Sequence, residues 1–459
     1  MSKRFDTKLD WLRWAVCCGV IVVALLANPT HVYCQFGGGF FQNVGGISVD
    51  ASGILNQVPR ELKNQMREQL LAHAGKVDGA LLENSKMRMI SLKGIEQALH
   101  TAISSNQELP DEIKYMAGIQ RLEYVFVYPE TQDIVLAGPG EGWTVDGDGN
   151  IVGVTTGMPV VRLEDFLVAL ATADNARRDY GISVSIDPTK EGVERFRRFT
   201  SFLRSFGPEH ARRAEEEFGN NVITLTGVPT DSRYANVLVA ADYKMKRLAM
   251  GFETAAINDM PSVLQMAEKR RQTLNGNSSP RFWLECAYES LKKSDDGLAW
   301  QINGSGAKAL TEEESRVSAT GKTAKASAIA NAWAKNMTDK FAELASKDVV
   351  FAELRNIMDM SVISALLMKE DLFAKAGLEA PHLLGVENVS LPKWHTPQTV
   401  PAHCSFTRIG TQWLITCSGG VVVDSWGVIS NVVVDSTIAA TRTLAASSPG
   451  SVAVFWNGK

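Results

Sequence analysis

Cysteine and histidine, the residues most often used in metal and redox sites, are scarce in this chain. Six of the 459 residues are cysteine and seven are histidine. The sequence contains no Cys-x-x-Cys, His-Glu-x-x-His or His-x-x-His pair, so the common zinc and thiol-redox motifs are absent. It also lacks the Gly-x-Ser-x-Gly elbow of α/β-hydrolases. We therefore predict no metal site and no cofactor, and we assign no catalytic residue.

Neither sign of charge dominates the composition. The chain has 47 Lys and Arg against 51 Asp and Glu, which gives a formal net charge of −4 at pH 7. A surface that binds nucleic acid needs an excess of basic residues to neutralise phosphates. We therefore predict that nucleic acid is not a partner of this protein.

Long apolar runs are equally rare, and the one that stands out lies near the N-terminus. Residues 14–27 form an apolar run that follows a basic start and precedes small residues. The run is shorter than the roughly 20 residues that span a bilayer. A basic start, a short apolar core and small residues beyond it are typical of a secretory signal. We predict a signal peptide over residues 1–34, with an uncleaved N-terminal anchor as the alternative.

The rest of the chain predicts an α+β fold with antiparallel β-hairpins, a βαβ-like element, a helical subdomain and a C-terminal β region. Its length corresponds to two or three domains at roughly 150 residues each. We expect an N-terminal β-hairpin and helical segment over residues 36–118 and a central α/β domain over residues 119–310. A helical subdomain over residues 311–385 and a C-terminal β region over residues 386–459 complete the division.

The central domain begins with two predicted hairpins. Residues 122–128 alternate in a run rich in aromatic and β-branched side chains, and residues 133–137 continue after a polar break, which indicates paired strands. The turn cluster at residues 147–150 separates two further short strands. Apolar residues at helical spacing over 163–170 then predict an amphipathic helix.

A strand–helix–strand–helix succession follows these hairpins. Residues 182–186 and 222–226 are predicted strands, and a helix begins after Asp187. A second helix is predicted over residues 231–250, with Gly251 as its C-terminal signal. This alternation favours a parallel βαβ element.

Three positions share the pattern Gly-x-x-Val-Asp-x-x-Gly, in which the Asp can bond its own backbone and the Gly supplies a positive φ. The predicted turn residues are Asp50 and Gly53, Asp146 and Gly149, and Asp424 and Gly427. The gaps between the three copies are unequal, which excludes a solenoid. The two remaining interpretations are three independent hairpins and a duplicated small β-unit.

The segment between Cys404 and Cys417 predicts a disulfide. Residues 409–412 form a plausible two-residue hairpin turn with Gly410 first, which is the type II′ preference. In that register the two cysteines face each other at a non-hydrogen-bonded position, with Cα atoms about 4.5 Å apart, which a disulfide can bridge. An oxidising compartment would permit the bond. The alternative is two reduced cysteines packed in a hairpin.

Several longer segments carry a resemblance to a known family. These are LAGPGEGWTVD, GMPVVRLEDF, SVSIDPTKEGVERF and SRYANVLVAADYKMKRLAMG. Together they resemble an uncharacterised family of exported planctomycete proteins, domain of unknown function 1598. The resemblance extends from about Val44 to the C-terminus and is most specific between residues 122 and 251. It implies export, and it implies no activity and no catalytic residue.

Export and the missing catalytic motifs favour a binding or assembly module of the cell envelope or extracellular space over an enzyme. We expect it in the periplasm, associated with the envelope or outside the cell, with an unknown partner there. Membrane contact is expected only through the N-terminal segment, if that segment is uncleaved. A hydrolase of envelope polymers with unidentified catalytic carboxylates is one alternative, because such carboxylates need proximity in space rather than in sequence. A structural surface protein is the other.

If the signal is cleaved, mass spectrometry of the native protein will find a new N-terminus between Asn28 and Phe36, because the candidate cleavage points follow Ala27 and Cys34. An intact Met1 recovered in the membrane fraction would contradict cleavage and support the anchor.

Overall fold

The computed structural model describes most of the chain beyond residue 41. The described residues are 42–59, 61, 63, 64, 67, 68, 79–177, 181–204, 208–270, 280–312, 327–385, 389–405, 417–446 and 454–457. The predicted signal segment over residues 1–34 lies outside them. Within the described part of the chain, no helix is both long enough and apolar enough to cross a membrane.

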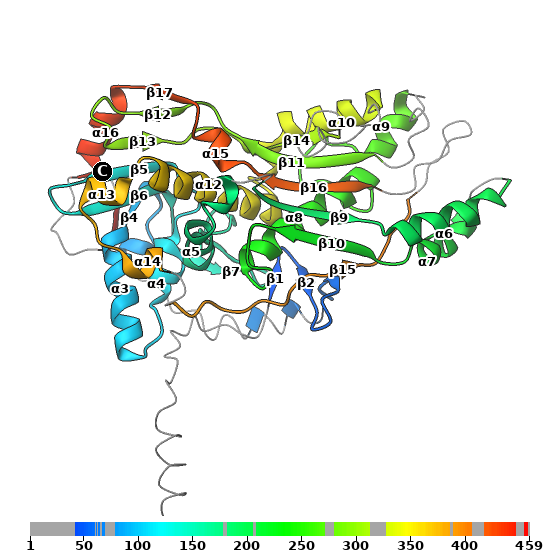
Figure 1. Cartoon of the computed structure of the whole chain (residues 1–459), viewed down its shortest axis with the longest axis horizontal. Helices are drawn as coiled ribbons and strands as arrows, with labels where there is room; N and C mark the ends of the chain where they lie inside the picture. The colour runs from blue at the N-terminus through cyan, green and yellow to red at the C-terminus, as the bar shows by residue number, and fades with distance from the viewer. Residues whose placement is uncertain are drawn as a thin grey trace, which may run out of the picture.

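Two large sheets lie side by side along the length of the molecule (Figure 1). The first has six strands in the spatial order β14-β11-β16-β9-β10-β15. These strands are β14 (Gly306–Thr311), β11 (Arg281–Ala287), β16 (Ser418–Val423), β9 (Ile182–Asp187), β10 (Asn221–Thr226) and β15 (Thr399–Val400). Strands from the predicted C-terminal region are thus inserted among strands from the centre of the chain.

The second sheet has seven strands in the order β17-β12-β13-β5-β6-β4-β18. These strands are β17 (Val432–Val434), β12 (Leu291–Lys293), β13 (Ala299–Gln301), β5 (Tyr124–Tyr128), β6 (Asp133–Gly140), β4 (Ser85–Ser91) and β18 (Phe455–Asn457). Two small sheets join β1 (Asn43–Val44), β2 (Ile47–Val49) and β3 (Leu55–Gln57), and β7 (Trp143–Val145) with β8 (Ile151–Gly153).

The two predicted central hairpins are confirmed. β5 pairs with β6 in antiparallel register, and β7 pairs with β8 around the predicted turn cluster. Alternation on β5 and β6 divides their side chains between two clusters, because successive residues of a strand face opposite sides. Val125 and Leu136 join the main core, whereas Phe126 and Val135 belong to a second cluster.

The predicted βαβ element is wrong, because β9 and β10 are antiparallel neighbours. The segment between them contains α6 (Lys190–Ser201) and α7 (Pro208–Phe218), which pack against each other through the stacked rings of Phe196 and Phe218. Because α6 and α7 form a helical hairpin, the chain returns to the sheet close to the end of β9, and β10 then runs antiparallel to β9. The parallel ladders of this fold are β11 with β16 and β12 with β17.

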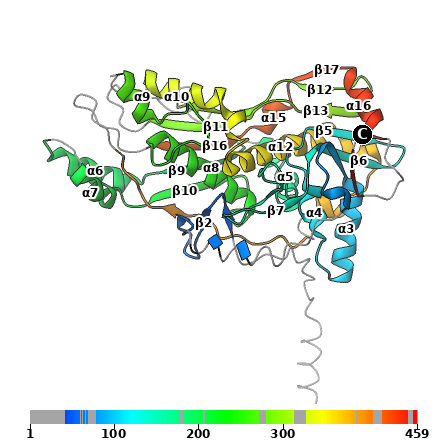
Figure 2. The same cartoon turned by 180° about the vertical axis from the view of Figure 1, so that it is seen from behind.

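The α+β class is confirmed, with helices gathered on the first sheet's buried face and over the second sheet (Figures 1 and 2). Helix α8 (Arg233–Met250) contacts β9 and β16, and α10 (Ala328–Asp339) contacts β14. Other helices are α3 (Leu92–Ser105), α4 (Asp111–Lys114), α5 (Leu163–Ala171), α9 (Val263–Arg270), α15 (Ser425–Val428) and α16 (Thr437–Ala445). The prediction for α8 holds at its end, where Gly251 has a φ of 73°.

Residues 327–384 are helical as predicted. They form α10, α11 (Phe341–Leu344), α12 (Val349–Lys369), α13 (Leu372–Ala376) and α14 (Pro381–Leu384). The C-terminal region is not purely β, because the described residues there include α15 and α16. The domain boundaries proposed from the sequence stay a prediction.

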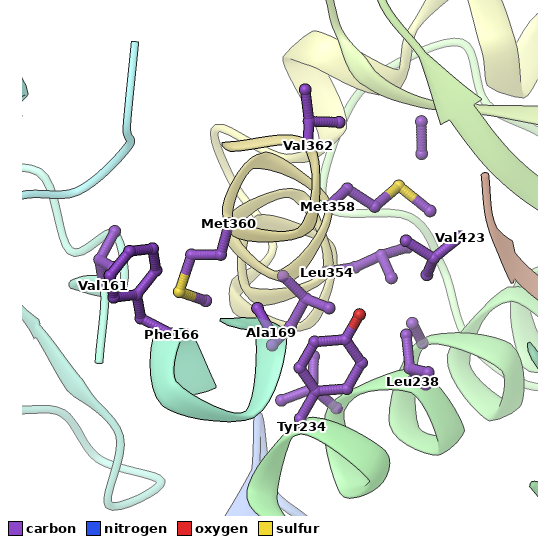
Figure 3. Close-up of a cluster of buried hydrophobic side chains, with 14 of the residues drawn as sticks. Val161, Phe166, Ala169, Tyr234, Leu238, Leu354, Met358, Met360, Val362 and Val423 are labelled. Atoms are coloured by element: carbon purple, nitrogen blue, oxygen red, sulfur yellow. The ribbon is translucent and has the colours of Figure 1, made fainter. Parts of the chain in front are cut away.

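Helices α5, α8 and α12 meet at the centre of the main core (Figure 3). Phe166 of α5, Tyr234 of α8 and Met358 of α12 are fully buried there, and Tyr234 shares a hydrogen bond with the hydroxyl of Ser361 at 2.7 Å. Each fully buried side chain of this size contributes roughly 1.5–3 kcal/mol by leaving water. The three helices are therefore packed as one unit.

A buried ion-pair network lies in this same unit. The guanidinium of Arg233, at the start of α8, binds Asp165 of α5 and Glu353 of α12, and all three residues are at most 2% exposed. The ring of Trp394 lies 6.0 Å from the guanidinium carbon. One positive charge faces two carboxyl groups, so a second negative charge would be buried without a full partner. Burial accordingly raises the pKa of Asp165 to about 7.

Replacing Asp165 with Asn should change how stability depends on pH. An unfolded Asp has a pKa of about 3.9, so the folded state holds its proton more tightly between roughly pH 4 and 7. The wild type should therefore lose stability as pH rises through this window. The asparagine side chain cannot ionise, so the unfolding free energy of Asp165→Asn should rise relative to that of the wild type as pH increases from about 4 to 7. Urea denaturation at a series of pH values measures this difference.

Asp435→Asn is the matched control, because the hydroxyl of Thr437 lowers the pKa of the half-buried Asp435 to about 2. Its stability should run parallel to the wild type from pH 4 to 8. Parallel curves for Asp165→Asn as well would contradict the raised pKa.

Candidate functional site

A polar cavity of about 500 Å³ lies at one end of the first sheet. Its charged and polar lining residues include Glu285, Tyr288, Glu289, Ser305, Lys308 and Asp424. The volume falls within the range of about 300–1,000 Å³ typical of small-ligand sites. A second cavity, beside Lys246 and Cys417, is only about 40 Å³ and is too small for such a ligand.

The sheet topology explains the position of this cavity. The parallel strands β11 and β16 end side by side, at Ala287 and Val423, and the antiparallel strand β14 begins beside them at Gly306. Ligands in sheets with parallel strands bind preferentially outside the carboxyl ends of those strands. The loops that leave β11 and β16 and enter β14 supply most of the cavity wall.

A buried carboxylate fixes the back of the cavity. Asp359 of α12 is completely buried and accepts a hydrogen bond of 2.6 Å from the hydroxyl of Tyr288. It also binds Arg121 through Nε at 2.9 Å, and Nη2 of Arg121 donates to the carbonyl of Gly304 at 2.9 Å. Tyr288 and Gly304 both line the cavity, so one network positions two separate loops. Burial raises the pKa of Tyr288 well above its usual value, so its hydroxyl remains a donor.

Negative charge predominates in the lining. Glu285, Glu289 and Asp424 are acidic, and Lys308 is the one basic residue among the lining residues of the described structure. Lys308 lies directly opposite Glu285 in the β11–β14 ladder. Opposite charges at such a position attract each other, so the lysine offsets one carboxylate. The remaining charge favours a ligand that carries a cationic group.

Cys286 also lines the cavity but is a poor candidate for a nucleophile. Burial raises the pKa of its thiol, and the nearby carboxyl groups of Asp424 and Glu285 raise it further. The thiolate is the reactive form of cysteine, so a thiol held protonated at neutral pH is inert. No group of three or more His, Cys, Asp and Glu residues in the described structure is placed to hold a metal ion.

Two of the three predicted turns have the expected backbone. Gly53 and Gly149 have φ values of 79° and 83°. Asp50 accepts hydrogen bonds from the backbone N–H groups of Ser52 and Ile54, and Asp146 binds the backbone of its own turn in the same way. These turns lie outside the cavity.

The prediction for the third turn is wrong, because Gly427 lies in the one-turn helix α15 and has no positive φ. The carboxylate of Asp424 accepts from the Gly427 N–H at 3.0 Å as an N-terminal cap, which selects helix over hairpin. Asp424 and Gly427 both line the cavity. Of the three predicted turns, the structure therefore brings only this one to the candidate site.

The predicted disulfide is also wrong, since Cys404 and Cys417 are both free. Cys404 packs with Phe196 and Phe218 beneath α6 and α7. Cys417 belongs to the main core and precedes β16, whose partners are β9 and β11. The predicted turn at residues 409–412 lies outside the described residues.

Comparison with known families locates one matched region in this fold. Residues 184–262 match the family described as Protein of unknown function (DUF1598). No curated protein and no solved structure matches the chain. The match supports a domain of unknown function, whereas planctomycete origin and export stay predictions.

The DUF1598 region contains most of β9, then the helical hairpin, β10 and α8. It includes Arg233 but none of the cavity lining, which comes from residues 285–308 and 424–431. The sequence analysis singled out Asp424 and Gly427 as turn residues but did not connect them with Glu285, Tyr288 or residues 304–308. The available signal was the pair of polar residues directly after β11, Tyr288 and Glu289.

Tyr288→Phe should destabilise the protein by about 1.5–3 kcal/mol, because it leaves the buried Asp359 carboxylate without one of its donors. Tyr124→Phe is the control, since the Tyr124 hydroxyl only accepts a bond from the neutral amide of Gln301. Urea denaturation of both variants measures the difference. Equal losses of stability in the two variants would contradict a charged Asp359 carboxylate behind the cavity.

Proposed function

We propose that this protein is an exported binding module whose cavity at the ends of β11 and β16 takes a small polar ligand with a cationic group. The observation that carries the proposal is the acidic lining, in which Glu285, Glu289 and Asp424 outnumber Lys308. Export rests on the sequence of the first 34 residues and on the family resemblance.

The shape and rigidity of the cavity support binding. Its back wall is anchored through Tyr288 to the buried Asp359, so the polar groups are held in place before a ligand arrives. Pre-organised groups bind with a smaller entropic cost than mobile ones.

The same carboxylates also favour one alternative, a hydrolase. Glycoside hydrolysis uses two carboxyl groups on either side of the scissile bond, and three carboxyl groups surround this cavity. A binding module leaves its ligand unchanged, whereas a hydrolase releases new reducing ends or new amines from cell-wall polymers. Product analysis after incubation with such polymers separates the two functions.

Isothermal titration with three five-carbon probes tests the proposal. Cadaverine, which carries two ammonium groups, should bind, whereas the neutral 1,5-pentanediol and the anionic glutarate should not. Salt should weaken cadaverine binding, because the attraction is electrostatic. Equal affinity for all three probes, or no affinity for any, would overturn the proposed ligand class.

Glu289→Gln should weaken cadaverine binding about tenfold, which corresponds to about 1.4 kcal/mol. Glu289 is an exposed side chain at the cavity, so its loss should leave the fold intact. Glu379→Gln removes an exposed carboxylate outside the cavity lining and should leave the affinity unchanged. The two variants carry the same change of charge, so a difference in their affinity for cadaverine comes from where the carboxylate lies.

A further inference from the structure

The seven-stranded sheet ends in an unusually apolar open edge. β17 is its outermost strand, and Val432, Val433 and Val434 are 36%, 45% and 67% exposed. Helix α16 follows β17 but packs its Ile438 and Ala445 on one face of the sheet, so it does not cover the edge (Figure 1). Exposed edge strands are usually protected by lysine, proline or a bulge. The three valines carry no such protection.

The backbone of β17 offers unpaired groups at this edge. The carbonyl of Asn431 accepts from Leu291 of β12 at 2.9 Å, and the N–H of Asp435 donates to β12 at 2.8 Å. In a parallel ladder, alternate residues of a strand direct both backbone groups toward the same neighbour. Val432 and Val434 therefore direct their N–H and C=O groups away from β12, toward the open edge.

This edge begins at the rim of the acidic cavity. Asn431 lines the cavity and immediately precedes β17, and Glu289 lines it just before β12. A chain paired with Val432 and Val434 would continue past Asn431 to the cavity. The apolar edge and the acidic cavity thus form one continuous surface.

We propose that the ligand is an extended peptide that adds to β17 as a further strand and places a basic side chain in the cavity. Strand addition uses backbone hydrogen bonds for affinity and a side-chain pocket for selection. Exposed valines on both faces of β17 favour β-branched residues at the paired positions of the peptide. This inference rests on the proposed function, because the cavity carboxylates select the basic side chain.

The test uses the peptide Thr-Val-Lys-Val-Thr-Val, labelled with fluorescein, and measures its affinity by fluorescence anisotropy. Val434→Pro removes one outward N–H and leaves the bonds to β12, since proline is tolerated on edge strands with that side facing solvent. We expect it to weaken peptide binding at least tenfold and to leave cadaverine binding unchanged. Val434→Thr keeps the N–H and should bind the peptide within threefold of the wild type.

Two peptides, one N-methylated at the odd residues and one at the even residues, make the same test from the ligand side with the wild-type protein, should Val434→Pro fail to fold. One of the two should lose binding, because one alternate set of N–H groups faces β17. Unchanged binding of both methylated peptides, or of the unmodified peptide to Val434→Pro, would overturn strand addition. Cadaverine binding without peptide binding would overturn this inference and leave the proposed function standing, whereas no binding of either probe would overturn both.

A dimer in light scattering that Val434→Pro abolishes would instead assign the edge to a second copy of the chain.

Discussion

The buried contact between Arg233, Asp165 and Glu353 is the constraint on which the rest of the structure depends. It joins three helices at a point without solvent, where the one positive charge of Arg233 lies between two carboxyl groups. Loss of Arg233 would leave these buried carboxyl groups without their cationic partner. Apolar packing alone would allow the helices to slide, since hydrophobic contact is not directional. The ion pairs instead require one relative position of α5, α8 and α12, and the first sheet is built against α8 and α12.

Helix α12 connects these buried ion pairs with the cavity. It carries Glu353 in the buried network and Asp359, which holds Tyr288 and Arg121 at the back of the cavity. The position of the cavity is thereby tied to the centre of the core. The matched DUF1598 region supplies Arg233, while the cavity lining comes from residues beyond it. The family match therefore bears on the core and not on the cavity, because function is determined by the site rather than by the fold.

The residues that line the cavity also limit which reactions and ligands are compatible with it. Its thiol is held protonated, and its acidic side chains outnumber its single lysine. The acidic lining supports the proposed recognition of a cationic ligand, and the adjacent open edge of β17 adds backbone groups that suit the proposed extended peptide. Cavity and edge meet only because β12 and β17, which pair in parallel, both begin beside the ends of β11 and β16.

The sequence by itself determined what depends on neighbouring residues. The alternating pattern of β5 and β6 produced a hairpin, and apolar spacing with Gly251 located α8 and its end, because turn chemistry and helix capping act over a few residues. The direction of β10 relative to β9, the separate environments of Cys404 and Cys417, and the cavity itself were decided only by the tertiary structure. Each depends on which distant segments pair. Glu285, Ser305 and Asp424 become neighbours only because β11 pairs with both β14 and β16, and no local pattern encodes that choice.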